Sequence, residues 1–508
     1  MDIAANLSNL LTVFTQPILL VYIGVGVFLG VYIGAIPGLS VTMAASLLIS
    51  FTYSWDILPA MAAMIGIYVG GVYGGSRSAI LLNIPGAPAA IATGLDGYPL
   101  AQKGLAGEVI GTTVMHSFIG GIIGTLFLLF GAPWLSKFAI KFGSFDYFLL
   151  AIMGMLLVGS MSKESTWRGL LSAAFGLLIG SIGLDTFTGH PRLTFGNTYL
   201  LNGVSYIVVM IGLFGMSEAL VQMRDMDIVP VKQKLDHIIP RWKDVTKYIG
   251  LSIRCSLLGT FVGALPGTGG DIAALMAYDH AKRSTKNPET PFGEGAFEGV
   301  VAPEAANNAA IGGAMIPMLT LGIPGDAVTA IIIGAMYIHG LQPGPRLMTQ
   351  SANIFWFMIG GMFVANLFLL LCGFTGIKLF AKIVEVPKYI LVPLIIILSV
   401  LGAYCITNSI TDVYWMLAFG VFGYFLKMYK FPIGPCILGV ILSNLLESNY
   451  RRGMTMARNN LWKFFLRFFK SPITIFLLCL LIFMVVSQSA WYKNLKDKLA
   501  AKIRGAKK

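Results

Sequence analysis

The chain has 508 residues, of which 56% are hydrophobic and only 12% are charged, and its formal net charge is +13. Soluble domains carry about twice that share of charged residues, so the composition excludes an ordinary soluble enzyme and predicts a protein surrounded by lipid. The Lys and Arg residues cluster beside apolar runs. This placement is typical of cytoplasmic membrane flanks rather than of a nucleic-acid-binding face.

Apolar runs recur along the whole chain. A helix needs roughly 20 apolar residues to cross a bilayer, and six runs approach this length, at 17–36, 110–131, 199–220, 354–372, 388–405 and 472–489. Shorter runs lie at 60–72, 149–159, 170–182, 249–265, 308–319, 327–338, 413–426 and 436–446. Because none alternates with a period of two, the runs predict helices rather than barrel strands, and we expect an all-α polytopic membrane protein of about 12 membrane segments.

The N-terminal segment does not resemble a cleavable signal, because the first basic residue of the chain is Arg77. The cysteines are dispersed through apolar segments, at Cys255, Cys372, Cys405, Cys436 and Cys479. Their spacing matches neither a metal site nor a disulfide framework, so we expect small buried hydrophobic residues at these positions.

Two pairs of similar stretches reveal an internal repeat. Residues 30–45 read GVYIGAIPGLSVTMAA and residues 259–274 read GTFVGALPGTGGDIAA, with seven of sixteen positions identical at an offset of 229. Residues 82–86 (LNIPG) match residues 321–325 (LGIPG) at an offset of 239. The ten extra residues lie in the polar loop 282–298. Two ordered matches predict that the chain consists of two related halves.

Each repeated stretch carries Pro-Gly within an apolar run, which predicts a helix break. Proline removes a backbone donor and glycine permits conformations that other residues avoid. The unpaired backbone groups left at membrane depth must be buried in protein or line a wet cavity, and paired breaks in two halves point to a transporter's midplane site. Ordinary kinked helices are the alternative. The expected breaks, whose carbonyls also form the expected ion site, are at Pro37, Gly38, Pro85, Gly86, Pro266, Gly267, Pro324 and Gly325.

Basic residues predict opposite orientations for the two halves. The first half is approached from a segment without Lys or Arg, which indicates the outer side, whereas the second is approached from the basic segment 224–247, which indicates the cytoplasm. The halves are therefore expected to be inverted repeats. Residues 50–58 hold no basic residue and residues 282–286 hold three. Each break thus resembles a re-entrant hairpin, with a fully crossing broken helix as the alternative.

The expected organisation has four parts. Residues 1–222 hold the first repeat and the membrane helices after it, and 223–247 form a basic cytoplasmic loop. Residues 248–446 hold the second repeat and its following helices, and 447–508 hold a basic interfacial segment, the last membrane helix and a basic tail. Basic residues stand on both sides of 472–489, a conflict that is resolved if 460–470 lies flat in the interface.

Polar residues near the breaks are the candidate substrate ligands. Amides at half-helix N-termini favour an anion, and unwound carbonyls favour a small cation. The candidates are Ser40, Thr42, Ser76, Asn83, Thr268, Gly269, Asn307 and Asn308. Serine and threonine also serve as packing groups in membrane helices. Two adjacent carboxamides in a small, apolar stretch need partners, so Asn307 and Asn308 are the stronger candidates.

Ionisable residues within apolar runs are the remaining candidates. Arg77 could pair with a carboxylate. Glu304 and Asp271 could hold a proton or a cation, although their nearness to loop ends makes an interfacial position equally consistent with the sequence. His116 and His339 are expected to pack or to lie at the interface, with proton handling as the alternative. No nucleophile elbow, zinc-helix motif or Walker loop is present, so neither an enzyme nor a cofactor is expected.

Three long strings resemble one transporter family. The strings GAIPGLS, GGVYGGSRSAILLNIPGAPAAIATGLDGYPLAQKG and EGVVAPEAANNAAIGGAMIPMLTLGIPGDAVTAIIIGAMYIHGLQPGP are similar to the large membrane subunit of tripartite tricarboxylate transporters, the TctA family. The resemblance is dense over residues 24–346. Asp326 departs from it, because a small neutral residue is expected after the last Pro-Gly.

The resemblance implies a secondary transporter of the bacterial inner membrane, with elevator-type movement. It imports tricarboxylates or dicarboxylates along a gradient of Na⁺ or H⁺, with a periplasmic solute-binding protein and a small membrane subunit. A channel or exporter for organic anions without a binding protein is the alternative. The carboxylate, the coupling ion and the oligomeric state are not indicated.

Overall fold

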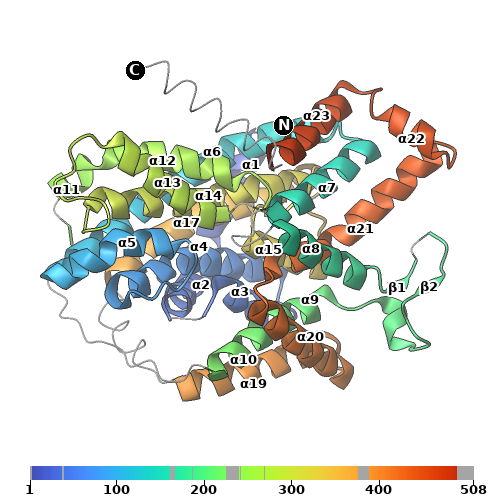
Figure 1. Ribbon diagram of the computed structural model, residues 1–508, viewed down its shortest axis with the longest axis horizontal. Helices are drawn as coiled ribbons and strands as arrows, with labels where there is room; N and C mark the ends of the chain where they lie inside the picture. The colour runs from blue at the N-terminus through green and yellow to red at the C-terminus, as the bar shows by residue number, and fades with distance from the viewer. Residues whose placement is uncertain are drawn as a thin grey trace. The chain divides into compact units, whose positions relative to one another are not determined.

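A computed structural model describes residues 3–36, 39–160, 166–185, 187–224, 239–240, 242–267, 269–375 and 388–488. The described residues are almost all helical (Figure 1). The strands among them are β1 (Gly183–Leu184) and β2 (Pro191–Arg192), which pair antiparallel. The expectation of an essentially all-α chain is confirmed for this part of the protein.

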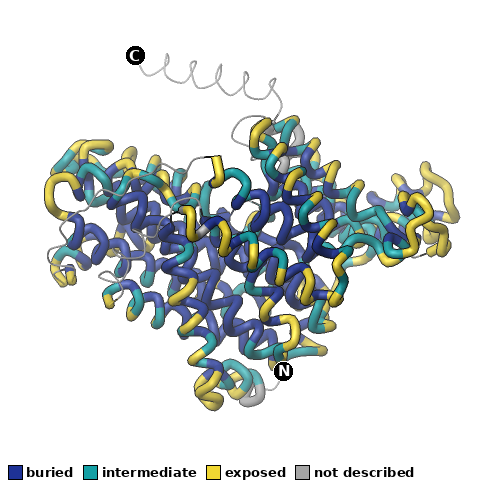
Figure 2. Tube along the Cα trace, turned by 90° about the horizontal axis from the view of Figure 1, so that it is seen from below, coloured by how far each residue is buried: buried dark blue, intermediate teal, exposed yellow. Residues whose placement is uncertain are grey.

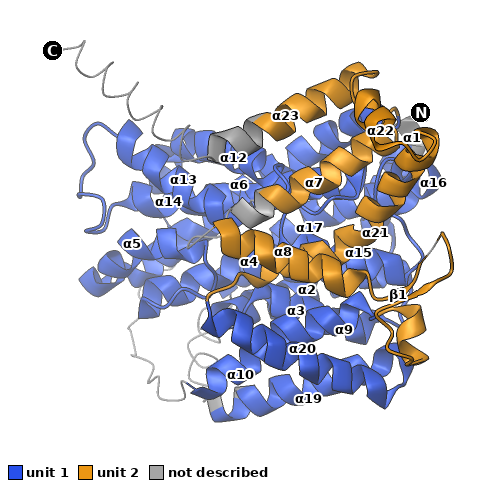
Figure 3. Cartoon of the chain, turned by 45° about the vertical axis from the view of Figure 1, so that its right-hand side comes forward, with its two compact units in different colours: residues 1–140, 204–429 blue, residues 141–203, 430–508 orange. Residues whose placement is uncertain are grey.

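The chain divides into two compact units (Figure 3). Unit 1 comprises Met1–Ile140 and Val204–Tyr429, and it holds both pairs of repeated stretches. Unit 2 comprises Lys141–Gly203 and Lys430–Lys508. The described helices of unit 2 are α7 (Ser144–Ser160), α8 (Thr166–Gly180), the short η2 (Tyr199–Asn202), α21 (Ile433–Met456), α22 (Leu461–Arg467) and α23 (Pro472–Gln488).

The first half of unit 1 is a series of helices interrupted at the expected places. They are α1 (Ile3–Thr15), α2 (Pro17–Ala35), α3 (Val41–Thr52), α4 (Ile57–Leu82), α5 (Ala90–Leu100), η1 (Ala101–Leu105) and α6 (Ala106–Ala139). Pro17 is the first residue of α2, where an amide hydrogen would have no partner within the helix, so proline is tolerated there. The gaps between α2 and α3 and between α4 and α5 coincide with the two Pro-Gly motifs of this half.

The second half repeats this order. After α9 (Tyr206–Met210), η3 (Ile211–Met216), α10 (Ser217–Arg224) and α11 (Trp242–Lys247) come α12 (Ile249–Gly263), α13 (Gly269–Ser284), α14 (Phe297–Leu321) and α15 (Ala327–Ile338). The unit continues with α16 (Leu347–Gln350), α17 (Ala352–Thr375), α19 (Lys388–Thr407) and α20 (Ile410–Met428). The gaps between α12 and α13 and between α14 and α15 again coincide with Pro-Gly.

Five helical stretches in the described residues are long and apolar enough to cross a membrane. They are Pro17–Ala35, Ile57–Leu82, Ala90–Ala139, Tyr206–Arg224 and Ala352–Thr375. A sixth candidate is the pair Leu461–Arg467 and Pro472–Ile482, which is bent by 99°. A multi-pass membrane protein is therefore supported, whereas the expected number of about 12 segments stays a prediction.

Helices α2 and α4 approach each other through glycine. A Cβ atom added to Gly30 would lie 2.6 Å from the carbonyl oxygen of Ile67, and one added to Gly34 would lie 2.4 Å from that of Gly71. These distances are shorter than any real side chain tolerates, so the backbones touch directly. Close approach of this kind is typical of membrane helices that pack through small residues.

The equivalent positions of the second half make the equivalent contacts. A Cβ at Gly259 would lie 2.1 Å from the oxygen of Ala306, and one at Gly263 would lie 2.3 Å from that of Ala310. Each pair of contacting residues follows its counterpart in the first half by offsets of 229 and 239. Helices α12 and α14 thus pack as α2 and α4 do.

Helices α4 and α14 are almost wholly buried, and Figure 2 shows that buried residues form much of the interior of the described chain. Between Ala60 and Leu81 only Val72 of α4 is incompletely buried, and between Gly299 and Thr320 only Ile316 of α14 is. These two helices lie in the interior of unit 1, where their side chains contact neighbouring helices on all sides.

Unit 2 is stabilised around the carboxylate of Asp185, in the loop between β1 and β2. Its Oδ1 atom accepts hydrogen bonds from the amides of Phe187 and Thr188, at 2.8 and 2.9 Å, and its Oδ2 atom pairs with Arg451. The amides of Thr188 and Phe187, followed by the charge of Arg451, lower the pKa of Asp185 to about 2. The carboxylate therefore remains ionised and paired throughout the neutral range.

Replacement of Gly263 by leucine tests the glycine contact. We expect Gly263→Leu to force α12 away from α14, at about 1–3 kcal/mol for an overpacked site, and to lower the melting temperature of the detergent-solubilised protein. Gly250 lies on the same helix with no atom within 4 Å of an added Cβ, so Gly250→Leu serves as the control. Equal melting temperatures for the two variants would contradict direct packing of α12 against α14.

Replacement of Asp185 by asparagine tests the ionic loop of unit 2. The folded carboxyl has the lower pKa, so its contribution to stability is complete above its unfolded pKa of about 4 and is lost as the pH falls through about 2. At neutral pH, Asp185→Asn should weaken the loop and increase tryptic cleavage at Arg192. Asp279→Asn, which breaks an exposed ion pair with Arg283, is the control and should leave that cleavage unchanged.

Candidate functional site

The breaks after α4 and α14 have the same backbone geometry. Asn83 and Gly322 both cap their helices in the left-handed conformation, with φ of 56° and 70°. In each half the amide of the next residue, Ile84 or Ile323, donates to the carbonyl six positions earlier, at 3.4 and 3.3 Å. This is how a helix ends when its last carbonyls are satisfied by the reversing chain.

The Pro-Gly turns that follow lie directly against helices of their own half. A Cβ at Gly86 would lie 2.2 Å from the oxygen of Gly34 and 2.9 Å from the Cα of Gly75, and one at Gly325 would lie 2.4 Å from the Cα of Ala314. Pro85 is exposed and Pro324 is buried. Glycine is therefore required in both turns for close approach.

The break between α2 and α3 places Ser40 and Thr42 together. Ser40 caps α3, because its Oγ accepts the amide of Met43 at 3.1 Å, and it shares a hydrogen bond of 2.8 Å with the hydroxyl of Thr42. Pro37 and Gly38 fall outside the described residues. The two predicted ligands thus stabilise the start of α3, where helix amides converge.

The break between α12 and α13 turns through two glycines with positive φ. Gly267 has φ of 80° and Gly269 has φ of 59°, conformations that favour glycine. Pro266 is half-buried, and Thr268 lies outside the described residues. A Cβ at Gly269 would lie 3.0 Å from the Cβ of Asp326, so this break meets the one between α14 and α15.

Asp326 joins the two halves. It caps α15 in a capping box, in which its Oδ1 accepts the amide of Thr329 and its own amide donates to the Thr329 hydroxyl, both at 2.8 Å. Its Oδ2 accepts a hydrogen bond from the hydroxyl of Tyr68, on α4 of the first half. The residue that departs from the family pattern therefore has a defined contact in the fold.

Two further polar contacts link α13 and α14 to the first half. Asp271 accepts a hydrogen bond of 3.0 Å from the amide of Ala89, just before α5. Asn307 donates through Nδ2 to the carbonyl of Val72 on α4 at 3.4 Å. A Cβ at Gly270 would lie 2.1 Å from Asn307 Oδ1, so the break requires glycine next to this carboxamide.

Glu304 occupies the centre of a cluster of hydroxyls. Its Oε1 accepts hydrogen bonds from Ser76 and, at 2.5 Å, from Thr93, and its Oε2 accepts one of 2.8 Å from Ser117. The side chain is completely buried. Helices α4, α5 and α6 all cover this turn of α14, and the depth of Glu304 in the membrane stays a prediction. Thr93 and Ser117 were not predicted, since single hydroxyls in small, apolar helices carry no distinctive pattern.

Asn308 lies one turn beyond Glu304. Its Nδ2 donates to the Glu304 carbonyl at 3.2 Å, and its buried Oδ1 has no hydrogen-bond partner among the described residues. A buried carboxamide oxygen without a partner is costly unless a ligand or water satisfies it. The predicted ligands Asn308 and Ser76 thus both contact Glu304.

Arg77 and His116 have structural partners. Arg77 is fully buried, and its Nη2 donates to the carbonyls of Gly373 and Cys372 at the end of α17, at 2.7 and 3.3 Å. His116 Nδ1 and the hydroxyl of Ser252 form a hydrogen bond of 2.5 Å. The guanidinium thereby satisfies last-turn carbonyls, which is a role distinct from the carboxylate pairing considered from the sequence.

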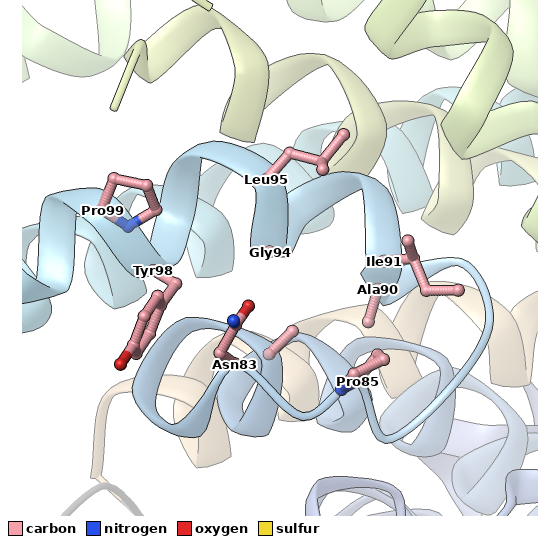
Figure 4. Close-up of a pocket in the computed structure, with 9 residues that line it drawn as sticks. Asn83, Pro85, Ala90, Ile91, Gly94, Leu95, Tyr98 and Pro99 are labelled. Carbon is pink, nitrogen blue, oxygen red and sulfur yellow. The ribbon is translucent and has the colours of Figure 1, made fainter. Parts of the chain in front are cut away.

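A pocket of about 400 Å³ opens between the two arms of the α4–α5 hairpin. Figure 4 shows Asn83 and Pro85 on its α4 side, facing Gly94 and Tyr98 on α5. Its remaining lining is apolar, with Ala79, Ala90, Ile91, Leu95 and Pro99. The predicted ligands that the structure describes therefore fall into three places: this pocket, the cap of α3, and the contacts of α13 and α14 with the first half.

Comparison with known proteins identifies the family of the chain. The sequence matches the description "Tripartite tricarboxylate transporter TctA family" over residues 20–438. An uncharacterised 52.8 kDa protein of the TAR-I ttuC' 3' region of Agrobacterium vitis is 36% identical over 462 residues, which are 91% of this chain and 92% of that protein.

A second relative is an uncharacterised protein of the TAR-II ttuC' 3' region of the same organism. It is 40% identical over 202 residues, which are 40% of this chain and 83% of that protein. No solved structure matches the chain. The family description covers all four helix breaks, and on this basis the chain belongs to the tripartite tricarboxylate transporter TctA family.

Proposed function

We propose that this chain is the substrate-translocating subunit of a cation-driven importer of tricarboxylates or dicarboxylates. Membership of the family supports the transporter class. The observation that carries the proposal is the polar junction at the break before α13. There Gly269 lies against Asp326, which bonds with Tyr68 of α4, and Asp271 bonds with the amide of Ala89 just before α5. A transporter needs its unwound backbone at such a junction between its two halves.

Helix N-termini at the breaks provide the chemistry for an anion. Helices α3, α5, α13 and α15 all begin immediately after a break, and the first amides of a helix point toward its N-terminus with partial positive charge. The Asn308 oxygen, which lacks a hydrogen-bond partner among the described residues, and the carboxamide of Asn307 are the proposed polar ligands beside these N-termini. Ser40, Thr42, Ser76, Asn83, Thr268 and Gly269 remain proposed members of this site.

The acidic side chains at the junction support coupling to a cation. Asp271 and Asp326 lie on consecutive breaks of the same half, and two carboxylates would repel an incoming carboxylate substrate. Binding of Na⁺ or H⁺ offsets that repulsion and makes anion binding depend on the cation. The carbonyls at Pro37, Gly38, Pro85, Gly86, Pro266, Gly267, Pro324 and Gly325 are the proposed ion ligands.

We place the two halves as inverted repeats that move in an elevator fashion. The matching glycine contacts and the matching left-handed caps support a common ancestral unit. The distribution of Lys and Arg supports the opposite orientation of the halves and about 12 membrane segments. The organisation 1–222, 223–247, 248–446 and 447–508 belongs to this proposal.

The proposed partners are a periplasmic solute-binding protein and a small membrane subunit in the bacterial inner membrane. They are drawn from the tripartite character of the family. Substrate selection is then shared, since the binding protein presents the carboxylate to the membrane subunit. The residues at the helix breaks of this chain therefore do not by themselves specify which carboxylate is transported.

Reconstitution tests the proposed function. Proteoliposomes that contain this chain and its small subunit should accumulate radiolabelled carboxylate only with the cognate binding protein and an imposed cation gradient. Omission of either should reduce uptake to the level of empty vesicles. Substrate flux without binding protein and without a gradient would instead establish the channel or exporter.

Replacement of Asn308 by alanine tests the substrate site. Loss of a hydrogen bond to a charged substrate costs about 1.5–3 kcal/mol, so we expect the KM for uptake to rise about tenfold or more with unchanged protein abundance. Asn366 provides a matched control, since its Nδ2 also donates to the carbonyl four residues earlier and its Oδ1 also lacks a partner among the described residues. Asn366→Ala should leave the KM unchanged, and a normal KM in Asn308→Ala would remove that residue from the site.

A further inference from the structure

The carboxyl group of Glu304 is held by three helices of the opposite half. Ser76 lies on α4, Thr93 on α5 and Ser117 on α6, and each directs its hydroxyl at one of the two carboxyl oxygens. Glu304 itself has no exposed surface. The cluster therefore exists only while α14 and these three helices keep their relative positions.

Glu304 has no cationic partner in the described part of the chain. The ion pairs found there join other residues, such as Arg192 with Glu447 and Lys427 with Glu218. An ionised carboxylate buried without a cation is far more costly than a protonated one, and three neutral hydroxyls offset only part of that cost. The environment thus opposes a permanent charge on Glu304 yet supplies donors that stabilise a temporary one.

Several charged and titratable groups on the helices packed against α14 contact groups other than Glu304. Next to the contacting hydroxyls, Arg77 of α4 donates to the end of α17, and His116 of α6 bonds with Ser252. Asp96 of α5 accepts the amides of residues 293, 295 and 296. On the remaining neighbours, Arg254 of α12 is exposed, Asp271 of α13 accepts the Ala89 amide, and Asp326 before α15 accepts from Tyr68.

We propose that Glu304 takes up and releases one proton in each transport cycle and is the coupling site of the transporter. This inference rests on the proposed cation-driven function. The carboxylate gains H⁺ to become a neutral acid, one of the three hydroxyls turns to accept the new O–H, and release of H⁺ restores the three bonds. No electron is transferred.

The distances favour a proton over a metal ion at this position. Oxygen atoms 2.5 and 2.8 Å apart are in direct hydrogen-bond contact, which leaves no gap for an ion between them. Because the donors come from separate helices, displacement of α5 from α14 removes stabilisation of the charged form. Movement of the hairpin and protonation of Glu304 are therefore linked.

Infrared spectroscopy of the purified chain tests the proton site without any partner. The carbonyl stretch of a protonated carboxyl, followed between acidic and alkaline buffer, should contain a titrating band that Glu304→Gln removes. Glu298 lies in the first turn of the same helix and is half-buried, and Glu298→Gln should retain the band. Identical difference spectra for the wild type and Glu304→Gln would overturn the inference.

A second variant keeps the test valid if Glu304→Gln does not fold. Ser117→Ala leaves the carboxyl in place and removes one donor to its charged form, so the band should disappear at a higher pH than in the wild type. An unchanged midpoint in Ser117→Ala would show that the band does not arise from this cluster.

Transport assays then test the coupling. In proteoliposomes with both partners, uptake driven by a pH gradient should fall more than tenfold in Glu304→Gln and change less than twofold in Glu298→Gln. Retained proton-driven uptake in Glu304→Gln, or wild-type uptake that follows Na⁺ without proton movement, would overturn the inference. A wild type that transports nothing contradicts the proposed function instead, and the infrared result still decides whether Glu304 titrates.

Discussion

Every helix break in unit 1 leaves backbone amides and carbonyls without helical partners, and the rest of the site follows from this constraint. The chain satisfies some of these groups locally, through the left-handed caps at Asn83 and Gly322 and the side-chain caps of Ser40 and Asp326. Others are satisfied by the opposite half, as when Asp271 accepts the amide of Ala89. In an apolar environment, such pairing is obligatory.

Direct backbone contact between α2 and α4, and between α12 and α14, makes this arrangement sterically feasible. Glycines at equivalent positions remove the side chains that would separate the helices. The Pro-Gly turns can then rest on the same helices, and the breaks come within reach of one another. The same glycine contacts, present in both halves, thus allow the helices to pack closely and the polar groups at the breaks to pair.

The described acidic side chains of the unit 1 interior are used differently from one another. Asp96 and Asp326 receive backbone amides and fix local structure. Glu304 receives only hydroxyls, from three separate helices. Glu304 thus differs from Asp96 and Asp326 in receiving no backbone amide on its carboxyl group, and its proposed role in proton uptake rests on this arrangement.

The sequence alone determined the helical class, the positions of the four breaks and the family, because apolar runs and Pro-Gly act locally and leave a readable pattern. It also identified Asn307 and Asn308 as polar residues in need of partners. Only the tertiary structure decided that Glu304 is fully buried, with donors from α4, α5 and α6. The donors lie about two hundred residues away in the sequence. A lone serine or threonine has the same local chemistry whether it packs or binds, so packing alone could distinguish them.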